Sequence, residues 1–368
     1  MPELSQEAYI LIGRYVGNRA DLATLCQVSK GFQHATERLL WNTLNLRDPE
    51  DTISICRILS TTPRVACLVD ALSIAATEEA SDSEESVEAL PDDYWDTVAA
   101  ALRRMTRLRF LTVHLEGASD ASMAWILDGC TFQLRNFHCD FTWDNHLLTF
   151  LNGQTQLCDL YIIDFKENTS DDNASPFDIH SLPKLSILEC TFTEAVTALV
   201  PNRPVVRVKT CFSKSGLEDK REEMKDLLAK LRLSRKHIRS LDLADASYNP
   251  DFSLELLAAV VNTFSTSNYL RYLGTLVLPI DGRERLSFYA LLMKLHRLQC
   301  IEVEVSDWDP APITPAALRA LMLELRLYCP TVTRVVFIYE FDRVAMKMAD
   351  SLCVLDNESN IESLWRDV

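Results

Sequence analysis

A short apolar pattern recurs along most of this chain and limits what the chain can fold into. The pattern is apolar-x-x-apolar-x-apolar, and its first copy is Val69/Leu72/Ile74. Further copies follow at Leu108/Leu111/Val113, Leu134/Phe137/Cys139, Leu157/Leu160/Ile162, Leu185/Leu188/Cys190, Ile238/Leu241/Leu243, Leu273/Leu276/Leu278, Leu298/Ile301/Val303 and Val332/Val335/Phe337, with a degenerate copy at Arg203/Val206/Val208. Because side chains alternate between the two faces of a strand, each copy predicts a short strand that buries one face.

Amphipathic stretches separate the copies and predict a helix in the intervals. Thr314-Pro315, for example, offers an N-cap residue followed by proline at the first helical position. A strand and a helix repeating every 18 to 39 residues are typical of leucine-rich repeats with insertions, whose units run about 20–29 residues. We therefore expect an α/β fold, a solenoid with a parallel β-sheet on its concave face and helices on its convex face. A compact α/β domain with parallel strands is the alternative.

Changes in composition divide the chain into five segments. Residues 1–46 carry apolar residues at helical spacing and predict a small three-helix domain, and residues 47–77 hold a linker and a first degenerate repeat. Residues 78–93 contain eight acidic and no basic side chains, which predicts a flexible loop. The irregular repeats occupy residues 94–340, and residues 341–368 are expected to form a capping helix and an acidic tail.

Composition excludes several functions. The net charge of −16 disfavours a protein that coats nucleic acid or anionic lipid. The 9 glycines include no G-x-G pair and no Gly-Lys, so the dinucleotide and P-loop fingerprints are missing. His138, Cys139, Asp140 and His146 come nearest to a metal-binding set, but strand alternation points Cys139 away from its two neighbours. We expect no catalytic residue, metal or cofactor.

The chain shows no sign of export or of a membrane span. Its first residues are acidic and lack an apolar signal region, and its longest uncharged run, residues 256–270, is shorter than the roughly 20 residues that a span needs. Eleven cysteines are scattered without a C-x-x-C pair. We expect free thiols in the cytoplasm or the nucleus, and no membrane or nucleic-acid partner.

The first 46 residues resemble an F-box. The matching pieces, in order, are Leu4-Ser5-Gln6-Glu7, Ile12-Gly13-Arg14-Tyr15-Val16, Asp21-Leu22, Leu25-Cys26-Gln27-Val28-Ser29-Lys30-Gly31-Phe32 and Leu40-Trp41. Ser5 stands where that family usually has proline. An F-box followed by irregular leucine-rich repeats is similar to the fungal-type substrate receptors of SCF ubiquitin ligases.

The resemblance implies a non-catalytic subunit with two binding surfaces. The F-box would bind a Skp-family adaptor and, through it, the cullin and RING subunits, while the repeats would bind a protein substrate. The apolar residues that would contact the adaptor are Leu4, Ile12, Val16, Leu22, Leu25, Val28, Phe32 and Trp41. The alternative is a repeat scaffold or inhibitor without a role in ubiquitination, in which the first 46 residues cap the solenoid.

Strand alternation also predicts the substrate surface. The neighbours of the apolar anchors should point to the concave face. The residues singled out in this way are Phe110, His114, His138, Tyr161, Arg207, Lys209, Glu302 and Glu304. They change from aromatic and histidine side chains to bases and then to acids along the chain. The alternative is that these are ordinary solvated residues and that binding uses loops or the carboxyl end.

Overall fold

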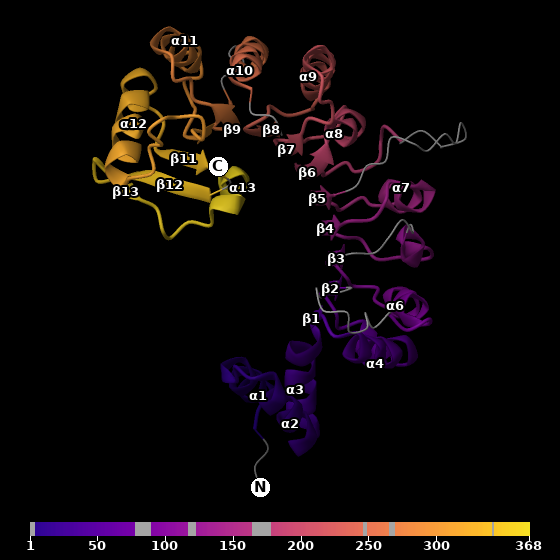
Figure 1. The fold of residues 1–368 in the computed structure, drawn as a ribbon. Helices are drawn as coiled ribbons and strands as arrows, with labels where there is room; N and C mark the ends of the chain where they lie inside the picture. The colour runs from indigo at the N-terminus through magenta and orange to yellow at the C-terminus, as the bar shows by residue number, and fades with distance from the viewer. Residues whose placement is uncertain are drawn as a thin grey trace, which may run out of the picture. The chain divides into compact units, whose positions relative to one another are not determined.

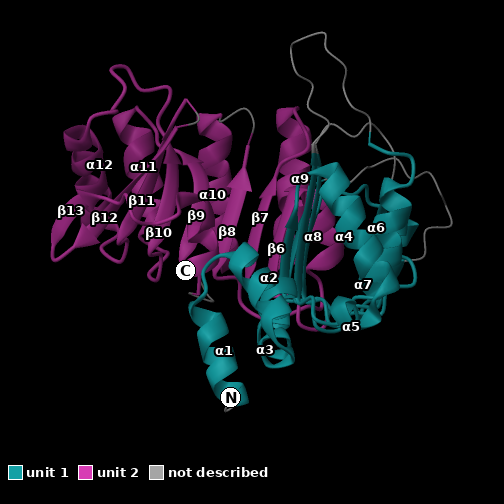
Figure 2. Cartoon of the chain, turned by 90° about the horizontal axis from the view of Figure 1, so that it is seen from below, with its two compact units in different colours: residues 1–182 teal, residues 183–368 magenta. Residues whose placement is uncertain are grey.

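The chain divides into two compact units, residues 1–182 and 183–368 (Figure 2). The computed structural model describes residues 4–77, 90–116, 123–163, 178–245, 249–264, 269–340 and 342–368. The predicted flexible loop at 78–93 lies outside the described residues from 78 to 89.

Unit 1 begins with three helices, α1 (Gln6–Tyr15), α2 (Arg19–Val28) and α3 (Lys30–Trp41). Ser5 and Ser29 cap α1 and α3, because each side-chain oxygen accepts a backbone N–H from the first turn. Glycine allows the helices to approach closely. A Cβ on Gly31 would lie 2.5 Å from the Tyr9 ring, and one on Gly13 would lie 2.7 Å from Thr36. Residues 6–41 therefore form three helices, with tight contacts at two glycines.

A parallel sheet follows in unit 1. Its strands are β1 (Thr43–Leu46), β2 (Ala71–Thr77), β3 (Phe110–Glu116), β4 (Asn136–Cys139) and β5 (Asp159–Ile162), and each pairs in parallel with the next. The helices between them are α4 (Pro49–Thr61), α5 (Pro63–Ala66), α6 (Tyr94–Leu102), η1 (Ala124–Leu127) and α7 (Asn145–Asn152). Figure 1 shows α4, α6 and α7 along one side of the strands, so within the described ranges of unit 1 no helix lies on the other face of the sheet. We call this the helix-free face of unit 1.

Unit 2 continues the same alternation and then changes direction. Its strands are β6 (Ile187–Phe192), β7 (Arg207–Cys211), β8 (Ser240–Ala244), β9 (Tyr272–Val277), β10 (Cys300–Glu304) and β11 (Arg334–Tyr339), all parallel, then β12 (Asp342–Ala349) and β13 (Leu352–Leu355), both antiparallel to their neighbours. The helices between them are α8 (Thr193–Leu199), α9 (Leu217–Leu231), α10 (Pro250–Phe264), α11 (Gly282–Leu292) and α12 (Pro315–Tyr328). Thr314 caps α12 as predicted, with Pro315 at its start.

Every predicted copy of the apolar pattern forms a strand, including the degenerate one at β7. The second and third apolar positions of each copy are buried. Strand and helix thus alternate in both units, and the sheet is mostly parallel, which is the architecture of leucine-rich repeats. The fold class predicted from the sequence is confirmed at this level.

Two segment boundaries differ from the prediction. Residues 43–46 were assigned to the three-helix domain, but they form β1, which pairs with β2. Residues 341–368 do not form a capping helix with a tail. They hold β12 and β13, then the short helices η2 (Ile361–Ser363) and α13 (Leu364–Asp367). Both errors concern elements that each bury two or fewer apolar side chains. Two apolar residues are too few to define a periodicity.

Candidate protein-interaction surfaces

Helices α1 and α2 expose large apolar side chains. Tyr15 is 84% exposed, Val28 63% and Leu11 57%, and Leu4 and Ile12 are also exposed. Leu11 and Tyr15 are one helical turn apart on α1, so they are neighbours on its surface. We call these five residues the exposed apolar set. Isolated apolar residues on a surface are ordinary, but four on two short helices, with Leu4 just before the first helix, are typical of a surface that another protein covers.

The residues predicted to contact an adaptor divide into two groups. Leu4, Ile12 and Val28 belong to the exposed apolar set, whereas Val16, Leu25, Phe32 and Trp41 are half-buried and Leu22 is buried within the bundle. Phe32 packs edge-to-face on Tyr9, with ring centroids 4.6 Å apart. Sequence reasoning missed Leu11 and Tyr15. Their spacing of four residues was a usable signal, because it marks a second apolar line beside the one that faces α3.

Hydrogen bonds from α2 connect the N-terminal helices to the first strand of the sheet. The Arg19 guanidinium donates hydrogen bonds to the backbone oxygens of Leu40 (2.6 Å) and Thr43 (2.8 Å). A small hollow of about 320 Å³ lies beside this contact and is lined partly by Trp41 and Leu44. The end of α3 is therefore fixed relative to β1, while the exposed apolar set lies on the other two helices.

The helix-free face of unit 1 brings three of the predicted substrate-binding residues together, and a fourth, Phe110, lies on the same face. His138 on β4 and His114 on β3 both lie edge-on to Tyr161 on β5, with ring centroids 5.7 Å and 6.4 Å apart. Phe110 at the start of β3 is 42% exposed. Beside this group, the Asp159 carboxylate accepts a hydrogen bond from the Asn136 amide at 3.1 Å. Phe110, His114, His138 and Tyr161 form what we call the aromatic patch.

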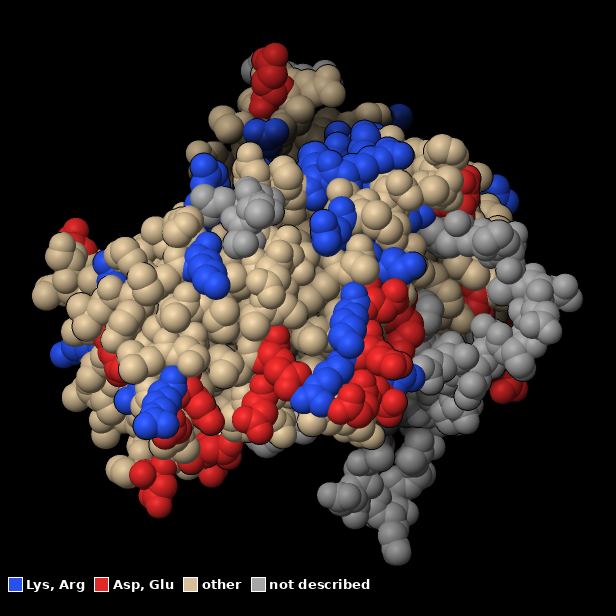
Figure 3. Space-filling model, turned by 90° about the horizontal axis from the view of Figure 1, so that it is seen from above, with Lys and Arg blue, Asp and Glu red and all other residues tan. Residues whose placement is uncertain are grey.

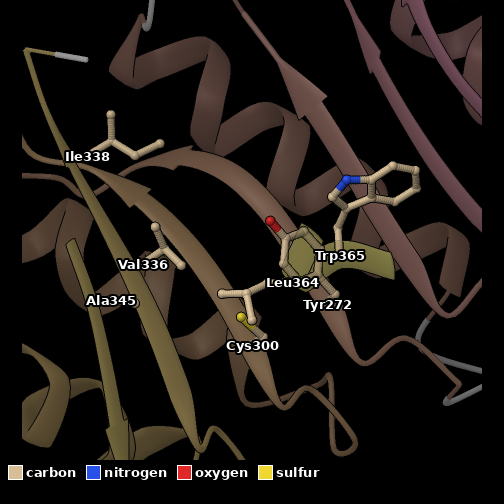
Figure 4. Close-up of a cluster of buried hydrophobic side chains, with 7 residues drawn as sticks. All are labelled: Tyr272, Cys300, Val336, Ile338, Ala345, Leu364 and Trp365. Atoms are coloured by element: carbon tan, nitrogen blue, oxygen red, sulfur yellow. The ribbon is translucent and has the colours of Figure 1, made fainter. Parts of the chain in front are cut away.

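The corresponding face of unit 2 is covered by the chain itself. Leu364 and Trp365 of α13 are buried against Tyr272, Cys300 and Val336, which point away from the helices that cover the other face (Figure 4). Ile338 and Ala345 complete this group, which we call the tail cluster. Figure 1 shows α13 on the side of the strands opposite α9–α12. Tyr272, Cys300 and Val336 on this face are therefore buried in one cluster with Leu364 and Trp365 of α13.

Four residues predicted to bind substrate thus make contacts within the chain or are buried. The Arg207 guanidinium donates to the backbone oxygen of Val368 at 3.1 Å, and Lys209 forms an ion pair with Glu189 at 3.2 Å. Glu302 is 0% exposed and lies 3.6 Å from Arg343, and Glu304 is also buried. Glu302 and Glu304 are therefore not part of an open surface, because strand alternation gives the direction of a side chain and not what lies over it. Arg207 and Lys209 are half-buried, and their role in binding a substrate stays a prediction.

Two buried carboxylates, those of Asp242 and Glu302, lie near each other in the sheet of unit 2. Asp242 on β8 is buried, and among the described residues its Oδ1 atom has no hydrogen-bond partner. Burial, and to a smaller extent the nearby charge of Glu302, raise the pKa of Asp242 to about 7. The opposite position on β9 is Gly274, where a Cβ would lie 2.8 Å from that oxygen. The site is therefore packed closely around an acid that favours its neutral form.

Residues before α13 are fixed to the sheet by one buried acid. The Asp356 carboxylate lies 2.9 Å from Arg334 Nε and 3.1 Å from Lys347 Nζ. Burial opposes its ionisation, but hydrogen bonds from Ser359 and Lys347 and the charge of Arg334 lower the pKa of Asp356 to about 2. Asp356 is therefore an ionic anchor at the start of the covering segment.

The helices of unit 2 present a mixed surface. Acidic and basic side chains lie next to one another there (Figure 3), and Arg221 on α9 pairs with both Glu218 and Glu255 at 2.5 Å. A hollow of about 690 Å³ between α9, α10 and α11 is lined partly by Leu254 and Leu291. Residues 203–239 carry 12 basic and 5 acidic side chains, and acids on the same and the neighbouring helix partly neutralise this basic excess.

Within the described ranges, no three His, Cys, Asp or Glu side chains are grouped so that they could hold a metal ion. His138 and Asp140 contact strand neighbours: the backbone N–H of Leu115 donates to the Asp140 carboxylate. None of the helices in the described part of the chain has both the length and the apolar character of a membrane span. All eleven cysteines are free thiols, as expected from the sequence.

No protein-family model and no curated protein matches the chain. Among solved structures, the chain is similar to the leucine-rich repeat-containing protein LegL7 from Legionella pneumophila. That match covers 81% of this chain and 82% of that one, with 14% sequence identity and a TM-score of 0.38.

Proposed function

We propose that this chain is a non-catalytic substrate-recognition subunit of an SCF-type ubiquitin ligase, in which the N-terminal helices bind a Skp-family adaptor. The observation that supports this proposal is the exposed apolar set on α1 and α2. Leu4, Ile12 and Val28 belong both to this set and to the residues that the F-box resemblance assigns to the adaptor. Burying such side chains in an interface would contribute about 1.5–3 kcal/mol each.

The alternative is a repeat scaffold or inhibitor in which the three helices cap the first repeat. The hydrogen bonds from Arg19 to the end of α3 and the start of β1 are compatible with a cap. A cap, however, needs a polar outer surface to keep the array soluble. Tyr15, Val28 and Leu11 are more than half exposed, which favours a helix pair that awaits a partner over one that ends the array.

In this proposal catalysis is a matter of position. The adaptor would place the chain near a cullin-bound RING and E2 module, and a bound substrate would gain a high effective concentration near the reactive thioester. No residue of this chain has to act as acid, base or nucleophile. The aromatic patch of unit 1 is the surface that we assign to the substrate, because aromatic side chains are frequent hot spots of protein interfaces.

Co-expression with a Skp-family adaptor tests the proposal. The full chain should co-purify with the adaptor in a stoichiometric complex. Val28→Asp should weaken binding by on the order of a thousandfold, since an unpaired charge in an apolar contact costs several kcal/mol. Leu327→Asp on α12 is the matched control, because Leu327 is also highly exposed but belongs to unit 2. A chain that melts normally and forms no complex with the adaptor would leave the scaffold as the better interpretation.

A further inference from the structure

The segment that covers unit 2 contacts the sheet as a short peptide ligand would. Leu364 and Trp365 enter the tail cluster, and the next residue, Arg366, lies 2.5 Å from Glu189 on β6. The Lys209 ammonium lies 6.0 Å from the Trp365 ring. Three consecutive side chains thus supply an aliphatic, an aromatic and a cationic contact.

Helix α13 has only four residues, Leu364–Asp367. A single turn of helix is not stable by itself, because the cost of nucleation exceeds what one turn of hydrogen bonds returns. The conformation of α13 therefore depends on its contacts with the face of β7 to β10. Those contacts come from a compact set of side chains, and another segment with the same side chains could make them.

Several buried polar groups in and beneath α13 have no hydrogen-bond partner among the described residues. Asp242 Oδ1 and Ser240 Oγ on β8 are buried without a hydrogen-bond partner in the described residues, and so is the indole N–H of Trp365 above them. Native structures leave few such groups, and each one weakens the contact that buries it. An occupant with a hydrogen-bond donor over Asp242 would match these polar groups better than α13 does.

We propose that the face of the unit 2 sheet opposite α9–α12, which α13 covers, is a docking groove for a short helical segment of a partner protein, and that residues 361–368 occupy this groove as an internal competitor. The partner segment would carry an aliphatic residue, an aromatic residue and an arginine in succession, with the arginine on Glu189. A further donor, such as a second basic side chain, would lie over Asp242. This inference rests on unit 2 alone and does not require adaptor binding.

A synthetic peptide with the sequence of residues 356–368 is the probe. In the intact chain the attached segment competes at an effective concentration in the millimolar range, so micromolar peptide should not bind. A full-length variant with Leu364→Ala and Trp365→Ala should bind the labelled peptide at least a hundredfold more tightly than the parent chain, measured by fluorescence anisotropy. Leu323→Ala with Leu327→Ala, two exposed positions on α12, is the matched control and should behave as the parent.

A charge reversal tests whether the peptide occupies the site that α13 occupies. Glu189→Arg in the opened variant should weaken peptide binding about tenfold or more, because it removes the partner of Arg366. A peptide that carries Arg366→Glu should recover most of that loss with the Glu189→Arg variant and should bind poorly to the opened variant without it. Binding that is indifferent to both changes would overturn the assignment of the groove.

Hydrogen exchange on the unmodified chain gives a test that does not depend on a variant. The amides of residues 361–367 should exchange much faster than those of β8 to β10, by local release of α13. Exchange of both regions at the same rate would show that the segment is an integral part of the core and would refute the proposal. A dimer of the parent chain that disappears in the opened variant would show that the face receives the tail of a second copy, which would equally overturn the partner that we assign.

Discussion

In each unit one face of the sheet lies opposite the helices that connect the strands, and the two faces differ in what lies over them. In unit 1 the aromatic patch, with Tyr161 at its centre, has exposed and half-buried side chains. In unit 2 the equivalent positions, such as Cys300 and Glu302, are buried under α13. The comparison shows that a repeated strand pattern specifies the direction of side chains, whereas their accessibility depends on a segment outside the pattern.

The largest predicted effect is a difference in the free energy of unfolding between substitutions on the two faces of the unit 1 sheet. Phe137 on β4 is buried against Phe150 on α7, with ring centroids 5.6 Å apart. Phe137→Ala should lower the free energy of unfolding by about 3–5 kcal/mol, because it leaves a cavity in the core. Phe110→Ala, on the helix-free face, should cost less than about 1 kcal/mol. Chemical denaturation measures both, and equal losses would show that the face of unit 1 is covered as well.

The next effect concerns thiol reactivity in unit 2. Cys300 lies in the tail cluster, where burial raises the pKa of its thiol. Opening the cover with Leu364→Ala and Trp365→Ala should increase the rate of maleimide labelling at Cys300 by about a hundredfold, because the thiolate is the reactive form. Cys139, which is buried on the other face of the sheet in unit 1, is the internal control. Peptide mapping after labelling should find Cys139 unreactive in both proteins.

A pH dependence should distinguish the covered face from the open one. Asp242 has its pKa raised from an ordinary 3.8 to about 7 by burial and by Glu302. The folded chain therefore keeps a proton that the unfolded chain releases, so this residue lowers stability as the pH rises from about 4 to 7, with no further change above. Asp242→Asn should raise the free energy of unfolding by about 2 kcal/mol at pH 8 and by little at pH 4.

Denaturation of parent and variant at these two pH values measures the effect. Asp159→Asn in unit 1 provides the comparison, since Asp159 accepts a hydrogen bond from Asn136 and should show no gain at pH 8. A constant difference between Asp242→Asn and its parent across this pH range would contradict the raised pKa.

The smallest effect on stability should accompany the clearest effect on binding. Tyr161→Ala removes the centre of the aromatic patch but only a half-buried side chain, so the melting temperature should change by a few degrees at most. Substrate capture in a pull-down with the adaptor-bound chain should fall about tenfold or more, as for an interface hot spot. Adaptor binding is the internal control. Unchanged capture would move the substrate surface away from unit 1.

The strands of this fold could be predicted because each copy of the pattern carries its own evidence. Leu241 and Leu243, for example, are buried, as two apolar residues at strand spacing predict. The covering segment could not be predicted in the same way. Leu364 and Trp365 are one apolar pair in a charged stretch, and their contacts with Tyr272 and Cys300 join positions far apart in the chain. The F-box resemblance located the N-terminal helices but did not separate exposed Val28 from buried Leu22.

The antiparallel pair β12–β13 has a consequence for how this array can change in evolution. β12 returns directly alongside β11, with Tyr339 paired to Asp342, whereas a further parallel repeat would need a crossover of a dozen or more residues. The far side of the pair is also engaged, since Arg319 on α12 donates to the backbone oxygen of Cys353 at 3.0 Å. Duplication can therefore lengthen the array between existing repeats but cannot extend it past β11 without removing this hairpin.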